Sequence, residues 1–232
     1  MMPDVEVRSP EAPLSPGEVH VLWWFIQGSI MELETRLRLR RAWGMCERHS
    51  VAALSTEAAF RHCYLHGPAI LYADLMDRAV RAFEMAGPLA GPRLARRLRV
   101  RGPCLMCELQ LGPNSAGGFI SDERVAEGRD LSRFRSFMAE SERHWRPTVC
   151  GRCACIAAAA RCRIHLLEDL ERNPATGLAQ HRALVARIAA HVKRYSVSLR
   201  WERRGTDSAE DRAALVGAVG WCGGWNTLLG VL

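Results

Sequence analysis

Cys104-Leu105-Met106-Cys107 and Cys150-Gly151-Arg152-Cys153 are two Cys-x-x-Cys pairs in one chain of 232 residues. Such a pair can wrap one turn so that both sulfurs reach one tetrahedral ion, and two pairs supply the four ligands of a closed site. The spacing therefore predicts one metal site formed by Cys104, Cys107, Cys150 and Cys153. We expect zinc there. The alternative is iron or an iron–sulfur cluster, because clusters also use four thiolates and Cys155 offers a fifth one nearby.

Two Cys-x-x-His pairs, Cys46/His49 and Cys162/His165, flank the cysteine pairs. Cys46 and His49 are candidate ligands of a second site, with His20 as a third. Three protein ligands and an open fourth position form the arrangement of catalytic zinc, whose bound water loses a proton near neutral pH. The alternative is a decayed site that leaves a surface histidine and a core cysteine. Cys162 and His165 either complete this second site or serve as a core cysteine and a solvent-exposed histidine.

Helical patterns cover most of the chain. Ser15-Pro16-Gly17-Glu18 has an N-cap serine, a proline at the first helical position and a carboxylate at the third, which predicts a helix start. Apolar residues at helical spacing follow it, at Val19, Leu22, Trp23, Ile26, Ile30, Leu33 and Leu37. Further helices are expected within 48–65, 68–86, 104–111, 131–145, 153–170, 178–195 and 209–219.

Two segments break the helical pattern. Residues 112–130 are rich in Gly, Ser, Asn and Asp, which predicts a loop. Residues 196–201 alternate apolar side chains with serine and arginine, which is the period of a strand. We therefore expect a mainly α fold, a helical bundle with zinc-knuckle-like Cys/His sites and little or no β structure.

The order of the Cys/His pairs along the chain predicts two related halves. In each half a pair of ligand-type residues is followed by a second pair that opens a helix, with His20-Val21-Leu22-Trp23 as the degraded first pair. Prolines and glycines between the halves, at Gly91, Pro92, Gly102 and Pro103, indicate a linker. The expected divisions are a disordered N-terminal arm (1–14), a first helical unit (15–87), a basic linker (88–103), a second helical unit with the four-cysteine site (104–219) and a Gly/Trp-rich tail (220–232).

Three stretches of the sequence occur together: Gly44-Met45-Cys46-Glu47-Arg48-His49, Leu65-His66-Gly67 with Leu71-Tyr72-Ala73-Asp74-Leu75, and Cys104-Leu105-Met106-Cys107. With these stretches the chain resembles an uncharacterised family of bacterial helical proteins, and the resemblance extends loosely to Ala190–Trp201. That family repeats a C-P-x-C pair followed by a G-x-C-P-x-H pair. Here the first C-P-x-C is absent, and Cys153 stands where the second histidine is expected. The resemblance implies a helical fold that binds metal, and it implies no activity.

Composition excludes several classes of protein. The chain has no apolar run near the ~20 residues of a membrane span and no secretory signal, so we expect a cytoplasmic protein without a membrane partner. The net charge is +7, nearly all of it from arginine, a bias typical of a GC-rich bacterial genome. The charge is densest in the runs Arg36–Arg41 and Arg93–Arg101. Because the charge is not clustered in the sequence and the second run lies in the predicted linker, a solvated basic surface is favoured, and a nucleic-acid partner is possible but not favoured.

Two classes of function remain. In the first, a metal staples a helical protein that binds or assembles with an unknown protein or small-molecule partner. In the second, an open metal site performs hydrolytic or transfer chemistry. The sequence carries no phosphate-binding glycine loop, no G-x-S-x-G elbow and no H-E-x-x-H motif that would name a reaction.

Overall fold

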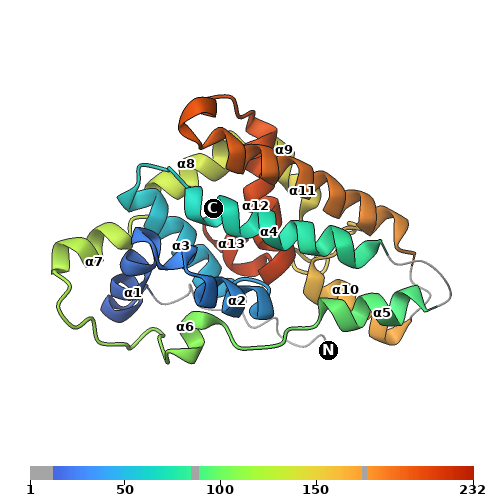
Figure 1. Cartoon of the computed structure of the whole chain (residues 1–232), viewed down its shortest axis with the longest axis horizontal. Helices are drawn as coiled ribbons and strands as arrows, with labels where there is room; N and C mark the ends of the chain where they lie inside the picture. The colour runs from blue at the N-terminus through green and yellow to red at the C-terminus, as the bar shows by residue number, and fades with distance from the viewer. Residues whose placement is uncertain (1–12, 85–88, 174–176) are drawn as a thin grey trace, which may run out of the picture.

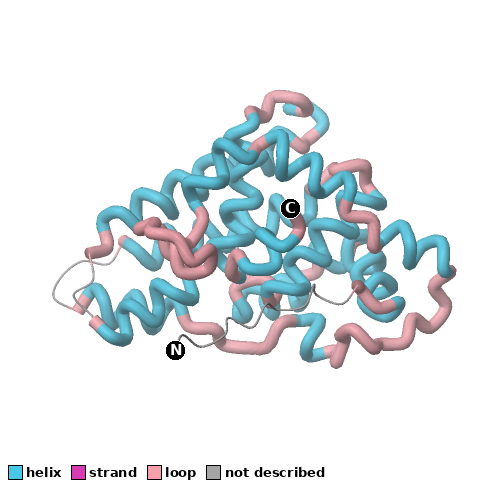
Figure 2. Tube along the Cα trace, turned by 180° about the vertical axis from the view of Figure 1, so that it is seen from behind, coloured by secondary structure: helices cyan, strands magenta, loops and turns pink. Residues whose placement is uncertain are grey.

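The computed structural model describes residues 13–84, 89–173 and 177–232, and this part of the chain is helical with no strand (Figures 1 and 2). The predicted mainly α fold is thus confirmed. In chain order the α-helices are α1 (Pro16–Gln27), α2 (Leu33–Ala42), α3 (Glu47–Phe60), α4 (His66–Phe83), α5 (Ala90–Leu98), α6 (Leu105–Glu108), α7 (Asp122–Gly128), α8 (Ser132–Glu140), α9 (Glu142–Trp145), α10 (Arg163–Arg172), α11 (Ala179–Ser198), α12 (Ala209–Gly223) and α13 (Asn226–Gly230).

The helices α4, α11 and α12 pack against one another at the centre of the molecule (Figure 1). All residues of 213–222 in α12 are buried, as expected for a helix that is apolar on every side. Gly220 is required there, because a methyl group at its position would lie 2.3 Å from the ring of Trp225. A single core includes side chains from both 15–87 and 104–219, so the two expected units share their interior.

The first predicted helix start is confirmed, but that helix is shorter than the apolar pattern suggests. Ser15 caps α1, and its side chain and that of Glu18 form the reciprocal bonds of a capping box. The helix ends at Gln27 and the chain turns at Gly28. A short 3-10 helix (Ser29–Met31) and α2 follow. Beyond the break the pattern does not mark the core: Leu33 and Leu37 of α2 are exposed, and α2 buries Leu39 and Ala42 instead.

Three expectations from local sequence are wrong. The predicted basic linker contains α5, which buries Leu94 and Leu98 and contacts α4 and α10. The predicted tail continues α12 to Gly223 and adds α13, with Trp221 and Trp225 fully buried. The strand-like segment 196–201 instead forms the end of α11, up to Ser198, and a turn that leads into a 3-10 helix at Trp201–Arg203. Tertiary burial explains the first two cases, since apolar side chains facing the core stabilise helices that glycine and proline weaken locally.

The predicted loop and the predicted N-terminal arm also differ in part from the structure. The predicted loop 112–130 contains α7, which Ser121 caps. The predicted N-terminal arm lies outside the described residues up to position 12, and its last two residues lead directly into α1. No helix in the described part of the chain combines the length and the apolar character needed to cross a membrane.

Candidate metal centres

Two groups of four side chains could each hold a metal ion. Cys46, His49, Cys104 and Cys107 form the first centre, and Cys150, Cys153, Cys162 and His165 form the second. Within each centre, all four ligand atoms lie within 4.8 Å of one another. Each centre therefore combines one Cys-x-x-Cys pair with one Cys-x-x-His pair.

The predicted four-cysteine pairing differs from this geometry. Cys104 and Cys107 lie with the first Cys-x-x-His pair, whereas Cys150 and Cys153 lie with the second. His20, on α1, belongs to neither group. The reason is tertiary, because α6 contacts α2 and its cysteines reach Cys46 and His49 at the start of α3, while a tight turn at 150–162 brings the later pairs together without help from α6. Cys162 and His165 complete the second centre, not the first.

The distances in the first centre fit a single tetrahedral ion. A metal with the bond lengths of zinc sets neighbouring ligands about 3.8 Å apart for two sulfurs and about 3.5 Å apart for sulfur and nitrogen. The Sγ atoms of Cys46 and Cys107 are 3.8 Å apart. His49 Nδ1 lies 3.1, 3.6 and 3.5 Å from the sulfurs of Cys46, Cys104 and Cys107. The sulfurs are also far beyond the about 2.05 Å of a disulfide.

The second centre has the same dimensions. Cys153 Sγ and Cys162 Sγ are 3.8 Å apart. His165 Nδ1 lies 3.2 Å from the sulfur of Cys150 and 3.3 Å from each of the sulfurs of Cys153 and Cys162. In both centres, therefore, the histidine turns the same ring nitrogen toward three sulfurs.

Three of the four ligand pairs share one local structure. Cys46, Cys104 and Cys162 are the N-cap residues of α3, α6 and α10, and the second ligand of each pair is the third residue of that helix. Backbone N–H groups at a helix start point outward and favour negative charge. The backbone N–H of the second ligand favours the thiolate form of each capping cysteine. Only the pKa of Cys104 is lowered overall, because hydrogen bonds with Cys104 and with Cys150 raise the pKa values of Cys46 and Cys162.

Thiolate character is uneven within each centre. Hydrogen bonding from Cys46, with a further contribution from His49, lowers the pKa of Cys104 to about 3, and the same bond raises the pKa of Cys46. In the second centre, hydrogen bonds from Cys153 and Cys162 lower the pKa of Cys150. One thiolate thus keeps its neighbours protonated. A divalent cation at the centre would allow all three sulfurs of a set to ionise.

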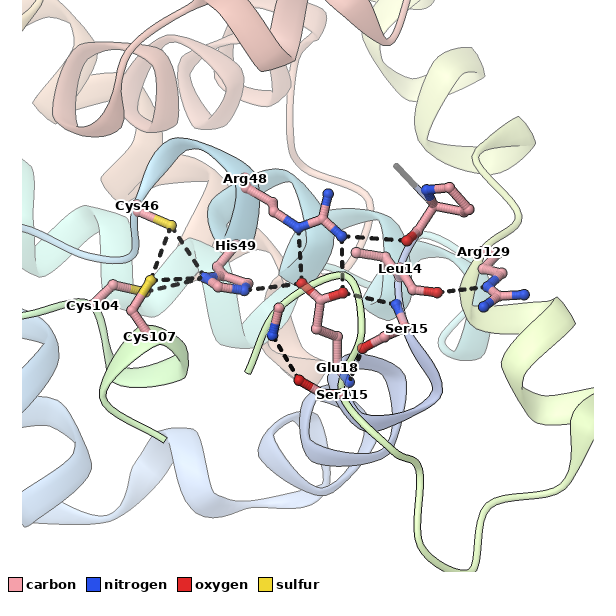
Figure 3. A network of polar contacts seen from close by, with 12 residues as sticks. Leu14, Ser15, Glu18, Cys46, Arg48, His49, Cys104, Cys107, Ser115 and Arg129 are labelled. Atoms are coloured by element: carbon pink, nitrogen blue, oxygen red, sulfur yellow. Dashed lines mark hydrogen bonds and ion pairs between the residues drawn. The ribbon is translucent and has the colours of Figure 1, made fainter. Parts of the chain in front are cut away.

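A buried carboxylate orients the histidine of the first centre. His49 Nε2 lies 3.1 Å from Glu18 Oε1, and Arg48 donates to both oxygens of Glu18, at 2.8 and 2.9 Å (Figure 3). The backbone N–H of Ser15 donates a further bond of 2.8 Å. Burial is the largest effect on Glu18 and raises its pKa, but the bonds from His49, Arg48 and Ser15 outweigh it and lower the pKa. The carboxylate is therefore charged.

Glu18 determines which nitrogen of His49 would bind a metal. Burial lowers the pKa of His49, yet its bonds with Cys104 and Glu18 raise that pKa to about 9, so the ring is protonated at neutral pH when no metal is bound. Loss of the Nδ1 proton on metal binding would leave Nε2–H donated to Glu18 and Nδ1 facing the sulfurs, which is the carboxylate–histidine arrangement that supports metal ligands. Sequence reasoning placed Glu18 only at a helix start. The three-residue spacing between Ser15 and Glu18 predicts a capping box, and it does not predict the contact between Glu18 and His49, which is 31 positions later in the chain.

The turn that carries the second centre is sterically constrained. Gly151 N–H donates to Ala160 O at 3.0 Å, and Ile156 N–H donates to Gly151 O at 2.9 Å. A methyl group at Gly151 would lie 2.2 Å from Ala158 O, so this position requires glycine. Asp169 accepts bonds from Arg152 and Arg161, at 3.2 and 2.9 Å, and so ties the turn to α10.

The remaining cysteines lie outside both centres. Cys155 is exposed, Cys63 is half-buried, and Cys222 is fully buried in α12. Cys155 is therefore not a fifth ligand of the second centre, which agrees with its absence from the four atoms that converge there.

The fold and the two centres define a helical protein with two sets of side chains that could hold metal ions. No known family model matches the chain, and neither the curated proteins nor the solved structures contain a match to it. The resemblance to a bacterial family with repeated Cys/His pairs stays a prediction.

Proposed function

We propose that the chain binds two zinc ions, which staple its fold, and that it acts as a binding or assembly protein. The observation that carries this proposal is the convergence of three sulfurs and one imidazole nitrogen in each centre. Closed sets of cysteine and histidine ligands are typical of structural zinc. The first ion would join the starts of α3 and α6, and the second would join the turn at 150–153 to the start of α10. The cysteines in both centres are free, so no disulfide already makes these links.

Zinc is favoured over an iron–sulfur cluster. In each centre all four ligand atoms lie within 4.8 Å of one another, which suits one ion at their middle. A cluster with several irons would hold ligands on different irons further apart. The short sulfur–nitrogen distances, between 3.1 and 3.6 Å, likewise suit a single ion.

The alternative function, metalloenzyme chemistry at an open site, has less support. That chemistry requires a metal held by Cys46, His49 and His20 with one coordination position left for water. In the structure, Cys104 and Cys107 instead give the first centre four candidate protein ligands. A four-coordinate site leaves no position for a reactive water. We place the protein in the cytoplasm, where reducing conditions keep the six ligand thiols available.

Elemental analysis of the purified protein by inductively coupled plasma mass spectrometry tests the proposal. We expect two zinc ions per chain, and we expect a strong chelator to remove them with loss of the helical circular dichroism signal. Iron in place of zinc would contradict the choice of metal. Removal of one ion with the fold intact would favour the metalloenzyme alternative, and a metal-free folded chain would contradict both.

A further inference from the structure

The fold brings the two arginine-rich runs of the sequence together. α2 carries Arg36, Arg38, Arg40 and Arg41, and the chain from α5 onward carries Arg93, Arg96, Arg97, Arg99 and Arg101. The backbone N–H of Arg101 donates to Arg41 O at 2.8 Å, which joins the second run to the end of α2. The lack of clustering in the sequence and the predicted linker were the reasons to disfavour a nucleic-acid partner, and the structure removes both.

A pocket of about 250 Å³ opens beside this junction. It is lined by Arg78, Arg81 and Ala82 of α4, by Arg97 of α5, and by Arg101. Among the described residues that line it, four are arginines and none is acidic. The volume is below the about 300 Å³ at which small-molecule sites begin, so it suits one anionic group better than a whole cofactor.

Backbone carbonyls and an aromatic ring hold two of these arginines in place. Arg78 lies over the ring of Trp43, 3.8 Å from its centroid, and donates to Arg40 O. Arg97 Nη1 donates to Arg81 O at 3.1 Å. Both carbonyls belong to the last turn of a helix, where unpaired carbonyl groups attract cations. The guanidinium groups are thus positioned without a carboxylate that would neutralise them.

Among the arginines that line the pocket, Arg81 alone pairs with a carboxylate in the described part of the chain. Asp74 lies 3.3 Å from Arg40, and Asp77 pairs with Arg81 on α4. In the described part of the chain, Arg78, Arg97 and Arg101 form no ion pair with a carboxylate. Burial, followed by the neighbouring charges of Arg101 and Arg40, lowers the pKa of Arg78 to about 10. Like charges held this close repel, and a bound anion would relieve the repulsion.

We propose that this pocket and the arginines around it bind the phosphate backbone of a nucleic acid, with one phosphate held by Arg78, Arg97 and Arg101. Guanidinium groups match phosphate because each offers several N–H donors in a fixed fork. The basic surface continues beyond the pocket to Arg93 and Arg96, both exposed, which favours a chain of phosphates over an isolated one. The inference does not depend on the metal bound at either centre.

Fluorescence anisotropy with a labelled DNA duplex and a labelled RNA single strand tests the proposal in the zinc-loaded full chain. The test variant is Arg97→Ala/Arg101→Ala. The matched control is Arg187→Ala/Arg203→Ala, which removes the same charge from exposed positions on α11 and on the 3-10 helix Trp201–Arg203. Circular dichroism and zinc content confirm that both variants fold.

We expect the wild type and the control to bind at low salt, and the test variant to bind about tenfold or more weakly. The dependence of log K on log salt should also become shallower by about 0.9 for a duplex or about 0.7 for a single strand, because the variant no longer neutralises the one phosphate held in the pocket. Equal weakening by the control variant would show that only net charge matters and would overturn the proposal. Binding of pyrophosphate or of anionic vesicles by the wild type, without binding of either oligonucleotide, would also overturn the proposal.

Discussion

Breaking the two metal centres one at a time should destabilise the protein by unequal amounts. The first centre closes the chain between His49 and Cys104, 55 positions apart, whereas the second closes it between Cys153 and Cys162, 9 positions apart. A cross-link restricts the unfolded chain more when it closes a longer loop. The loop-closure relation for disulfides, applied to these metal links, gives about 4.2 kcal/mol for the first loop and about 2.6 kcal/mol for the second.

Cys107→Ser and Cys153→Ser are suitable variants because neither side chain is fully buried, so the substitution removes a ligand with little loss of packing. We expect the free energy of unfolding in urea to fall about 1.6 kcal/mol further for Cys107→Ser than for Cys153→Ser. Cys155→Ser is the matched control. Its side chain is exposed and lies outside both centres, so stability and zinc content should not change.

Zinc content measured on the same samples assigns each loss to a centre. Each test variant should keep one of two zinc ions, and Cys46→Ser should behave as Cys107→Ser does. The pairing is refuted if Cys107→Ser and Cys153→Ser remove one and the same ion, because a site shared by both cysteine pairs would then exist. Loss of different ions with equal loss of stability would instead refute the loop-length argument.

Three more predictions follow from single side chains. Glu18→Gln should lower the zinc affinity of the first centre about 10- to 100-fold in competition with a chromophoric chelator, and unchanged affinity would show that Glu18 does not support His49. Gly151→Ala should lower the melting temperature and release zinc from the second centre, whereas Gly177→Ala, whose methyl group meets nothing within 4 Å, should do neither. Burial raises the pKa of Glu57 to about 7, so Glu57 contributes stability below its unfolded pKa of about 4.5 and loses it as the pH rises through 7. The neutral variant Glu57→Gln should therefore gain up to about 3 kcal/mol over the wild type between pH 5 and 8, and parallel stability curves would contradict this.

Much of the fold follows from patterns within single segments. The capping box at Ser15 and Glu18 and the apolar spacing of α4 and α11 predict helices because both depend on neighbours within a turn or two. The helix α5 and the end of α12 did not follow in this way. Their glycines and prolines weaken a helix locally, and only the burial of Leu94, Leu98 and Trp221 in a core built from distant segments compensates.

The sequence by itself identified the four Cys/His pairs as candidate ligands, since the spacing of two positions between paired cysteines and histidines already limits both side chains to one turn, but it also proposed His20, which lies in neither group. All eight residues of the four pairs lie in one centre or the other. Only the tertiary structure decided which pairs meet, because that depends on how packing of α6 on α2 brings Cys104 and Cys107 to the start of α3 and on how the turn at 150–162 closes. The same holds for Glu18 beside His49 and for the arginines around the pocket, which are contacts between segments that no local pattern encodes.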